Sequence, residues 1–154
     1  MKTPIVKVHA VPGARLPDKA TPGSAGRDVH ALLPPDTFVE LSPGGRMTIP
    51  TGLYFEIPPG WFITLRPRSG LALKSGLTLL NAPATIDSDY RGELRVLLVN
   101  LGQEFARIES GDRIAQLFLE KVQDFDWETV PVLEHLEESE RGSGGFGSTG
   151  VGLA

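Results

Sequence analysis

Residues 77–100 read LTLLNAPATIDSDYRGELRVLLVN, a polar turn between two apolar runs. The runs, 77–81 and 94–100, are rich in Leu and Val and carry the composition of strands. We therefore predict a β-hairpin whose tip, residues 84–93, presents two carboxylates and a tyrosine.

The charged residues of this tip have two interpretations. Asp87 and Asp89 are common turn formers, and Arg91 and Glu93 could be cross-strand charges. Ile86 points to a different role, because an apolar residue beside Asp87 would fix the turn in a core and leave the carboxylate partly desolvated. A carboxylate held in that way can act as a general base, which is typically worth about 10²–10⁴-fold in rate. The residues alone leave both interpretations open.

Length and composition bound the fold class and the partners. A chain of 154 residues is expected to form one domain. Its 40% hydrophobic and 22% charged residues are ordinary for a globular protein. The net charge of −4 argues against nucleic acid or an anionic membrane as the main partner. A small anionic ligand remains compatible with a local cluster of arginines.

Cysteine usage and the N-terminus exclude other classes. The sequence has no cysteine, so a disulfide framework and a thiolate metal site are both excluded, and its three histidines lack ligand spacing. No apolar run resembles a signal peptide or approaches the roughly 18 residues of a membrane span. We therefore expect a cytoplasmic protein.

Glycine and proline punctuate the chain. The 18 Gly and 13 Pro fall between short runs of β-branched and aromatic residues, which predicts an all-β barrel or jelly roll. Strands are expected at residues 5–8, 29–32, 37–41, 47–49, 53–57 and 61–65. Helix is expected only at 69–75 and 132–140. The composition turns acidic at Glu134 and then glycine-rich, so we expect a folded domain over 1–133 and a linker with a mobile arm over 134–154.

Two segments before the predicted hairpin carry candidate site residues. Asp28 follows a loop of small residues, where it could simply end a turn. Further on, a strand ends at a proline and a short helix is expected to begin at Ser69. Anions are favoured at a helix N-terminus, and Arg68 beside it could add charge-assisted bonds to a phosphate. The alternative is an N-cap serine between surface arginines.

Two segments after the predicted hairpin also carry candidate site residues. Gln116 falls among apolar neighbours, where an amide is costly to bury unless it is paired, so it satisfies backbone groups or faces a ligand. The glycine-rich C-terminus contains Arg141 and Phe146, which a plain linker would not require. They suggest a closing arm whose aromatic ring stacks on a planar ring of a ligand while Arg141, Ser148 and Thr149 hold phosphates.

These five segments, in this order and spacing, resemble the five motifs of the trimeric deoxyuridine triphosphate nucleotidohydrolases (dUTPases). The resemblance extends from Ala25 to Thr149. It implies a β-jelly roll with one short helix, hydrolysis of dUTP, and a homotrimer in which each active site draws on all three subunits.

The resemblance also implies a role for each motif residue. Asp87 matches the catalytic aspartate, which activates the attacking water and contacts the 3′-hydroxyl. Tyr90 matches the tyrosine under the deoxyribose that leaves no room for a 2′-hydroxyl. Asn81 matches the asparagine that pairs with uracil, and Ile86 belongs to the same substrate-binding hairpin.

The remaining motifs concern the phosphates and the metal. Arg68, Ser69, Gly70 and Gln116 match phosphate-binding positions, and Asp28 matches an aspartate that acts near Mg²⁺ through water. Arg141, Phe146, Gly147, Ser148 and Thr149 match the arm that closes over the substrate.

Two departures and two alternatives accompany the resemblance. Ala84 stands where the family usually has glycine, which would restrict the hairpin if the backbone there needs a positive φ, and Val29 replaces a commoner leucine.

A dCTP deaminase shares the fold and a similar Arg-Ser segment, but relies on a glutamate in place of Asp87 and lacks the arm. A non-catalytic nucleotide-binding protein would have no use for a general base.

Overall fold

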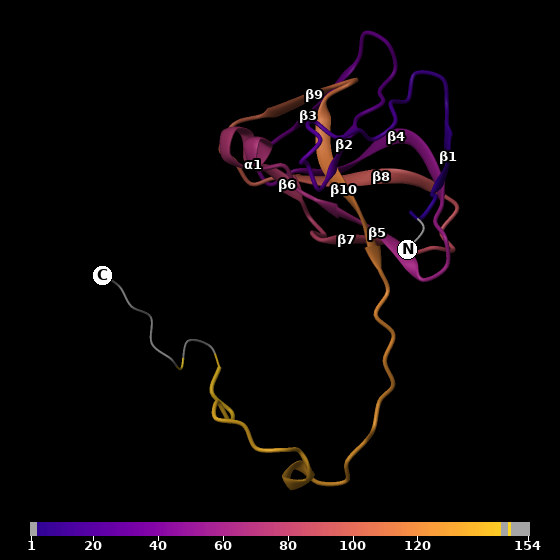
Figure 1. The fold of residues 1–154 in the computed structure, drawn as a ribbon. Helices are drawn as coiled ribbons and strands as arrows, with labels where there is room; N and C mark the ends of the chain where they lie inside the picture. Colours follow the sequence, from indigo (N-terminus) through magenta and orange to yellow (C-terminus); the bar gives the residue numbers. More distant parts are fainter. Residues whose placement is uncertain (1–2, 146–147, 149–154) are drawn as a thin grey trace. The chain divides into compact units, whose positions relative to one another are not determined.

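The computed structural model describes residues 3–145 and 148 (Figure 1). The chain divides into two units, Met1–Gln123 and Asp124–Ala154, which we describe separately. Among the described residues, no helix has the length and apolar character needed to cross a membrane.

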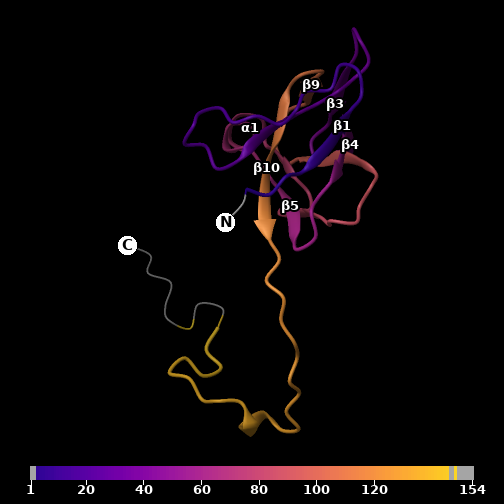
Figure 2. The ribbon, with the colours of Figure 1, turned by 45° about the vertical axis from the view of Figure 1, so that its right-hand side comes forward.

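The first unit is built from strands, as predicted, with α1 (Ser69–Ser75) as its α-helix within the described residues. One four-stranded sheet has the order β1 (Lys7–Ala10), β4 (Arg46–Glu56), β8 (Glu93–Asn100), β6 (Leu77–Leu79). A second has the order β2 (Arg27–His30), β10 (Arg113–Lys121), β5 (Trp61–Arg66), β7 (Ala84–Ile86). A two-stranded sheet pairs β3 (Phe38–Leu41) with β9 (Ala106–Glu109). The all-β, jelly-roll-like fold class is therefore confirmed (Figures 1 and 2).

The sheets share one core because their strands alternate. On β8, Leu94, Val96 and Leu98 are each at most 2% exposed, whereas Arg95 between them is exposed. Ile63 and Leu65 of β5 belong to the same buried cluster. Burial of such side chains contributes roughly 1.5–3 kcal/mol each, so this core holds the strands that carry the polar turns.

The predicted hairpin is only partly right. Strand β6 does pair with β8, with Leu77 opposite Asn100. The connecting stretch is not a simple tip, because it contains β7, which pairs with β5 in the other sheet. Ala84 is buried and Ile86 packs against the core, so this short strand alternates as a half-buried strand should. The chain thus crosses from the first sheet to the second before β7, and it returns to the first sheet through the turn that contains Asp87.

Two predicted strands, 47–49 and 53–57, form the single eleven-residue strand β4. Its pairing with β8 shifts register between Pro50 and Tyr54. Gly52 lies at this irregularity with φ +68°, and a Cβ there would lie 2.5 Å from the Leu32 side chain. Position 52 therefore requires glycine for both conformation and space.

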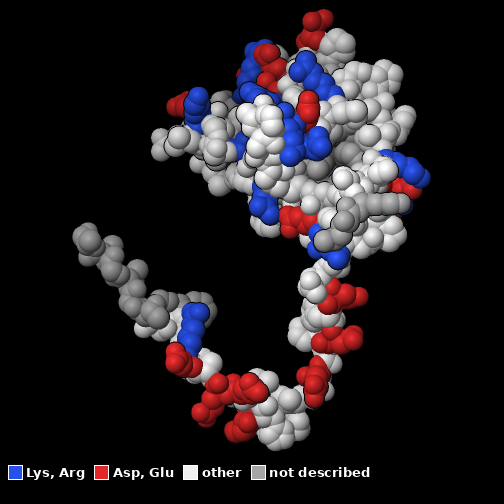
Figure 3. All heavy atoms as spheres, viewed as in Figure 1, with Lys and Arg blue, Asp and Glu red and all other residues white. Residues whose placement is uncertain are grey.

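The helix predicted for 132–140 is wrong. The structure has only the 3₁₀ turn η1 (Leu133–His135). Glu134, Glu137 and Glu138 would be neighbours on one helix face, and their repulsion disfavours a longer helix. Residues 124–140 contain seven Asp and Glu and no Lys or Arg, and Figure 3 shows acidic side chains along this part of the second unit.

A carboxylate on the outer face of the second sheet should make stability depend on pH. Glu120 accepts hydrogen bonds from Thr64 Oγ1 (2.6 Å) and Arg66 Nη2 (2.8 Å). The bond from Thr64, followed by that from Arg66, lowers the pKa of Glu120 from its ordinary value of 4.5 despite some desolvation. The unfolded chain therefore binds the proton more readily, so this stabilisation is present above pH 4.5 and is lost as pH falls through the lower, folded-state pKa.

We expect the free energy of unfolding of Glu120→Gln to fall less steeply than that of wild type as the pH is lowered. Urea unfolding between pH 6 and pH 3 would measure it, with Glu109→Gln as the control at another partly exposed ion pair. Parallel acid limbs for wild type and Glu120→Gln would contradict the assignment.

Candidate active site

A cavity of about 240 Å³ lies beside the crossing between the sheets. Of the predicted site residues, it brings together Asn81, Ile86, Asp87 and Tyr90. The other residues that line it are Ala84, Thr85, Glu93, Leu94 and Arg95. We call this cavity the turn pocket.

Asp87 is positioned by the strand that precedes it. Ile86 pairs with Ile63 of β5 and packs against the core, and the backbone N–H of Tyr90 donates to the Asp87 carbonyl (3.2 Å), which closes the turn. The Asp87 side chain itself is exposed, so the expectation that Ile86 would leave it partly desolvated is wrong for the single chain. Ile86 points inward, and the residue after it projects away from the core.

Tyr90 is held against the backbone of the same turn. Its Oη donates to the carbonyl of Glu93 (3.0 Å). The ring crosses Gly92 so closely that a Cβ there would lie 2.3 Å from Oη. Gly92 was not predicted as a site residue, and the structure shows that this position has no room for a side chain.

Ala84 fits its position without strain. It lies in β7 opposite Leu65 and is 5% exposed. Asp36 is the one residue other than glycine with a positive φ in the described part of the chain, so the conformation that would exclude alanine does not occur at position 84. Val29 is fully buried in the core.

A second group forms around Asp28, which lies in β2 and is 6% exposed. Arg68 Nε donates to Asp28 Oδ1 (3.1 Å), and Arg113 Nη1 lies 3.5 Å from Oδ2. Arg68 also donates to the Arg113 carbonyl (3.2 Å). A buried carboxylate needs such pairing, and in return it fixes the direction of Arg68. We call these three residues the arginine cluster.

Ser69 and Gly70 follow the cluster at the start of α1. The N-cap is Arg68, and no side-chain hydrogen bond caps this helix, so the alternative of an N-cap serine is wrong. Ala72 N–H bonds the Arg68 carbonyl, and a Cβ at Gly70 would meet nothing within 4 Å. Ser69 and Gly70 are exposed, so the first turn of this helix is accessible next to Arg68 in the sequence.

Gln116 lies at the centre of the second sheet. It sits opposite Asp28 of β2 on one side and Arg66 of β5 on the other, and it is half-buried. The register therefore places it next to the arginine cluster. Arg113 lies three residues before Gln116 on the same strand and was not predicted as a site residue.

The turn pocket and the arginine cluster belong to opposite ends of β5. Asp87 follows Ile86, which pairs with Ile63 near the start of that strand, and Arg68 follows its end at Arg66. At about 3.3 Å per residue, the positions of Ile63 and Arg68 are roughly 16 Å apart along the chain. The turn pocket and the arginine cluster are therefore separate within one chain, and we call them the two half-sites because each holds part of the predicted site.

The arm residues belong to the second unit. Arg141 Nε donates to the Gly144 carbonyl (2.7 Å), and Ser148 N–H donates to the Gly145 carbonyl (3.0 Å). The predictions for Phe146, Gly147 and Thr149 lie outside the described residues.

The residues that the structure describes include no group of three or more His, Asp or Glu side chains able to hold a metal ion. Both oxygens of Asp28 already face guanidinium groups. Asp28 therefore does not fit as a direct metal ligand, which leaves only contact through water.

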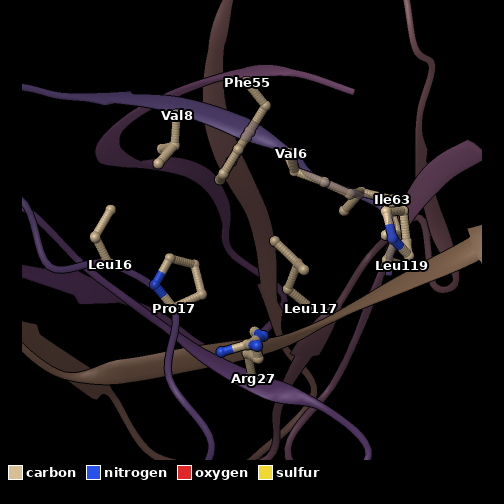
Figure 4. A pocket seen from close by; sticks show the side chains of 10 residues that line it. Val6, Val8, Leu16, Pro17, Arg27, Phe55, Ile63, Leu117 and Leu119 are labelled. Carbon is tan, nitrogen blue, oxygen red and sulfur yellow. The ribbon is translucent and has the colours of Figure 1, made fainter. Parts of the chain in front are cut away.

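A further cavity of about 310 Å³ is apolar and contains none of the predicted site residues. Figure 4 shows that Val8, Phe55, Ile63 and Leu117 are among its lining side chains, and Arg27 is the only charged residue among the described residues that line it. It offers no group for acid–base chemistry, so the candidate site remains with the turn pocket and the arginine cluster.

Known proteins share this sequence and fold. A family model described as dUTPase matches residues 13–150. A deoxyuridine 5′-triphosphate nucleotidohydrolase from Bartonella bacilliformis is 51% identical over 148 residues, which cover 90% of this chain and 84% of that relative. A relative with the same name from Caulobacter vibrioides is 52% identical over 136 residues, which cover 88% of this chain and 86% of that relative.

The solved structure of the Staphylococcus bacteriophage 80alpha dUTPase with dUPNHPP superimposes with a TM-score of 0.81. It is 28% identical and covers 97% of this chain and 100% of its own. The family model spans both half-sites, and the two relatives are each about half identical to this chain. This chain therefore belongs to the dUTPase family.

Proposed function

We propose that the protein hydrolyses dUTP to dUMP and pyrophosphate, which lowers dUTP and supplies dUMP for dTMP synthesis in the cytoplasm. The observation that carries the proposal is the turn pocket, which places the Asp87 carboxylate beside Tyr90 and Asn81. A planar base and a sugar are the ligand parts that these amide and aromatic side chains suit.

In the proposed reaction, Asp87 orients a water molecule and takes its proton. The water oxygen forms a bond to the α-phosphorus, the bond from that phosphorus to the bridging oxygen breaks, and pyrophosphate leaves. Arg68, fixed by Asp28, balances charge on the phosphates, and Gln116 and the N–H groups at Ser69 and Gly70 orient them. The pocket is open in the single chain, so water must be excluded by other parts of the assembly.

We propose a homotrimer with shared sites. The separation of the two half-sites along β5 supports this proposal. One substrate molecule can contact both half-sites if each is contributed by a different chain. The arm of Arg141, Phe146, Gly147, Ser148 and Thr149 would come from the third chain and close over the substrate.

Mg²⁺ is proposed to bind with the triphosphate. Oxygen ligands from phosphates and water suit this ion, which supplies charge neutralisation when bound. On the protein side, Asp28 would contribute only through water, since its carboxylate is held by Arg68 and Arg113.

Product analysis after separate incubation with dUTP, dCTP, dTTP and UTP tests the proposal. We expect consumption of dUTP alone, with dUMP and pyrophosphate as products. A site that hydrogen-bonds uracil leaves polar groups unpaired when cytosine binds, which is the stronger kind of discrimination. Conversion of dCTP would favour the dCTP deaminase alternative, and binding of dUTP without turnover would favour a nucleotide-binding protein.

A further inference from the structure

The pairing between β4 and β8 is interrupted beside the turn pocket. It runs from Arg46 opposite Val99 to Pro50 opposite Arg95, and resumes with Tyr54 opposite Glu93. In between, β4 has three residues, 51–53, where β8 has only Leu94. Such a bulge leaves backbone N–H groups without a carbonyl partner across the ladder. Thr51 and Gly52 are both buried, so their N–H groups need another acceptor.

The Glu93 side chain is that acceptor. Its Oε1 accepts from the N–H groups of Gly52 (2.9 Å) and Thr51 (3.2 Å). Its Oε2 accepts from Arg95 Nη1 (3.1 Å), and Arg95 also reaches the Thr48 carbonyl (3.4 Å). The Glu93 side chain is only 18% exposed, so these are sheltered, charge-assisted bonds.

The backbone of the same residue holds the tyrosine. The Glu93 carbonyl accepts the hydrogen bond from Tyr90 Oη. Glu93 therefore joins the bulge of β4, through its side chain, to the Tyr90 ring, through its carbonyl. Thr51 reinforces the junction, because its Oγ1 donates to the Leu94 carbonyl (2.6 Å).

We propose that Glu93 is a positioning residue of the turn pocket, which fixes the Tyr90 ring and thereby the discrimination between deoxyribose and ribose. The inference rests on the proposed function and on the role that the resemblance implies for Tyr90, which is to pack against the deoxyribose. Without the carboxylate, two buried N–H groups must find new partners, and the start of β8 shifts together with the carbonyl that holds Tyr90. Small displacements of a positioning group have large effects on recognition.

The test compares Glu93→Ala and Glu93→Gln with wild type, using kcat and KM for dUTP and for UTP. We expect Glu93→Ala to lower the dUTP-to-UTP ratio of kcat/KM about tenfold, mainly through a lower KM for UTP, because a displaced Tyr90 ring leaves room for the 2′-hydroxyl. Glu93→Gln should lie close to wild type, because its amide oxygen still accepts from both N–H groups. Glu109→Ala is the matched control, since Glu109 is also a strand carboxylate paired with an arginine (2.8 Å) but lies outside the turn pocket.

A lower melting temperature of Glu93→Ala with an unchanged dUTP-to-UTP ratio would overturn the inference, because it would show a purely structural role. If Glu93→Ala does not fold, Glu93→Asp replaces it: the carboxylate is one methylene shorter and cannot reach both N–H groups, so an unchanged ratio overturns the inference equally.

Failure of the proposed function has a different signature. If wild type turns over no dUTP, calorimetry with the imido analogue dUpNHpp and its ribose counterpart decides the matter. Selective binding by wild type that is weakened in Glu93→Ala supports the positioning role, whereas equal selectivity, or no binding by wild type, overturns it.

Discussion

Replacing Asp87 by Asn should lower kcat for dUTP by about 10²–10⁴-fold and leave the affinity for dUpNHpp close to that of wild type. The amide has the shape of the carboxylate but cannot take a proton from water. Asp87 is exposed and follows β7, whose last residue, Ile86, packs against the core, so the substitution should not alter stability. Single-turnover kinetics and calorimetry would separate the chemical step from binding.

Asp89→Asn is the matched control, because Asp89 is exposed in the same turn but does not line the turn pocket. It should keep wild-type turnover. A fully active Asp87→Asn would remove the general base from the mechanism, and equal losses in both variants would point to the charge of the turn rather than to one carboxylate.

The same variant can show whether sites are shared. Asp87→Asn and Arg68→Ala should each be inactive alone, yet mixed trimers would contain sites with Asp87 from one chain and Arg68 from another. For random mixing of equal amounts, about a quarter of the sites would be intact. Mixtures that stay inactive after subunit exchange would argue that each chain uses its own two half-sites.

Local sequence patterns predicted much of this fold. The bounds of α1 and the pairing of the strands around the turn follow from punctuation by Gly and Pro and from apolar runs. Strand β7 was missed because three residues are too few for a periodic signal, and its partner β5 lies about twenty positions earlier. Its crossing between the sheets is decided by packing, which a local pattern does not contain.

The candidate site shows the same limit. Asp87, Tyr90 and Asn81 are neighbours in sequence, and the sequence analysis grouped them. Arg113 and Asp28 are separated by 85 residues, so nothing local indicates that two arginines share one carboxylate. The expected metal role of Asp28 came from resemblance alone, and the pairing of both its oxygens limits that role to contact through water.

Deleting residues 141–154 should leave folding intact and cut turnover of dUTP severely, by about 10²-fold. Within the described part of the chain, every residue of the buried core cluster lies between Val29 and Leu117, so the deletion removes none of these residues. What it removes is the segment proposed to cover an open turn pocket, with Phe146 over the base and Arg141 near the phosphates. Thermal unfolding and steady-state kinetics on the same preparations would measure the two effects.

Deletion of residues 150–154 alone is the control, because it keeps all five proposed arm residues and should retain activity. The two deletions together separate closure from other uses of the C-terminus. An unchanged rate without residues 141–154 would contradict the closing role, and the exposed Asp87 would then have to work in a site open to water. A loss in both deletions would instead place the requirement at the end of the chain, beyond the motif residues. Loss in the longer deletion alone is expected, because electrostatic stabilisation by Arg68 and Arg141 is strong only where water is excluded.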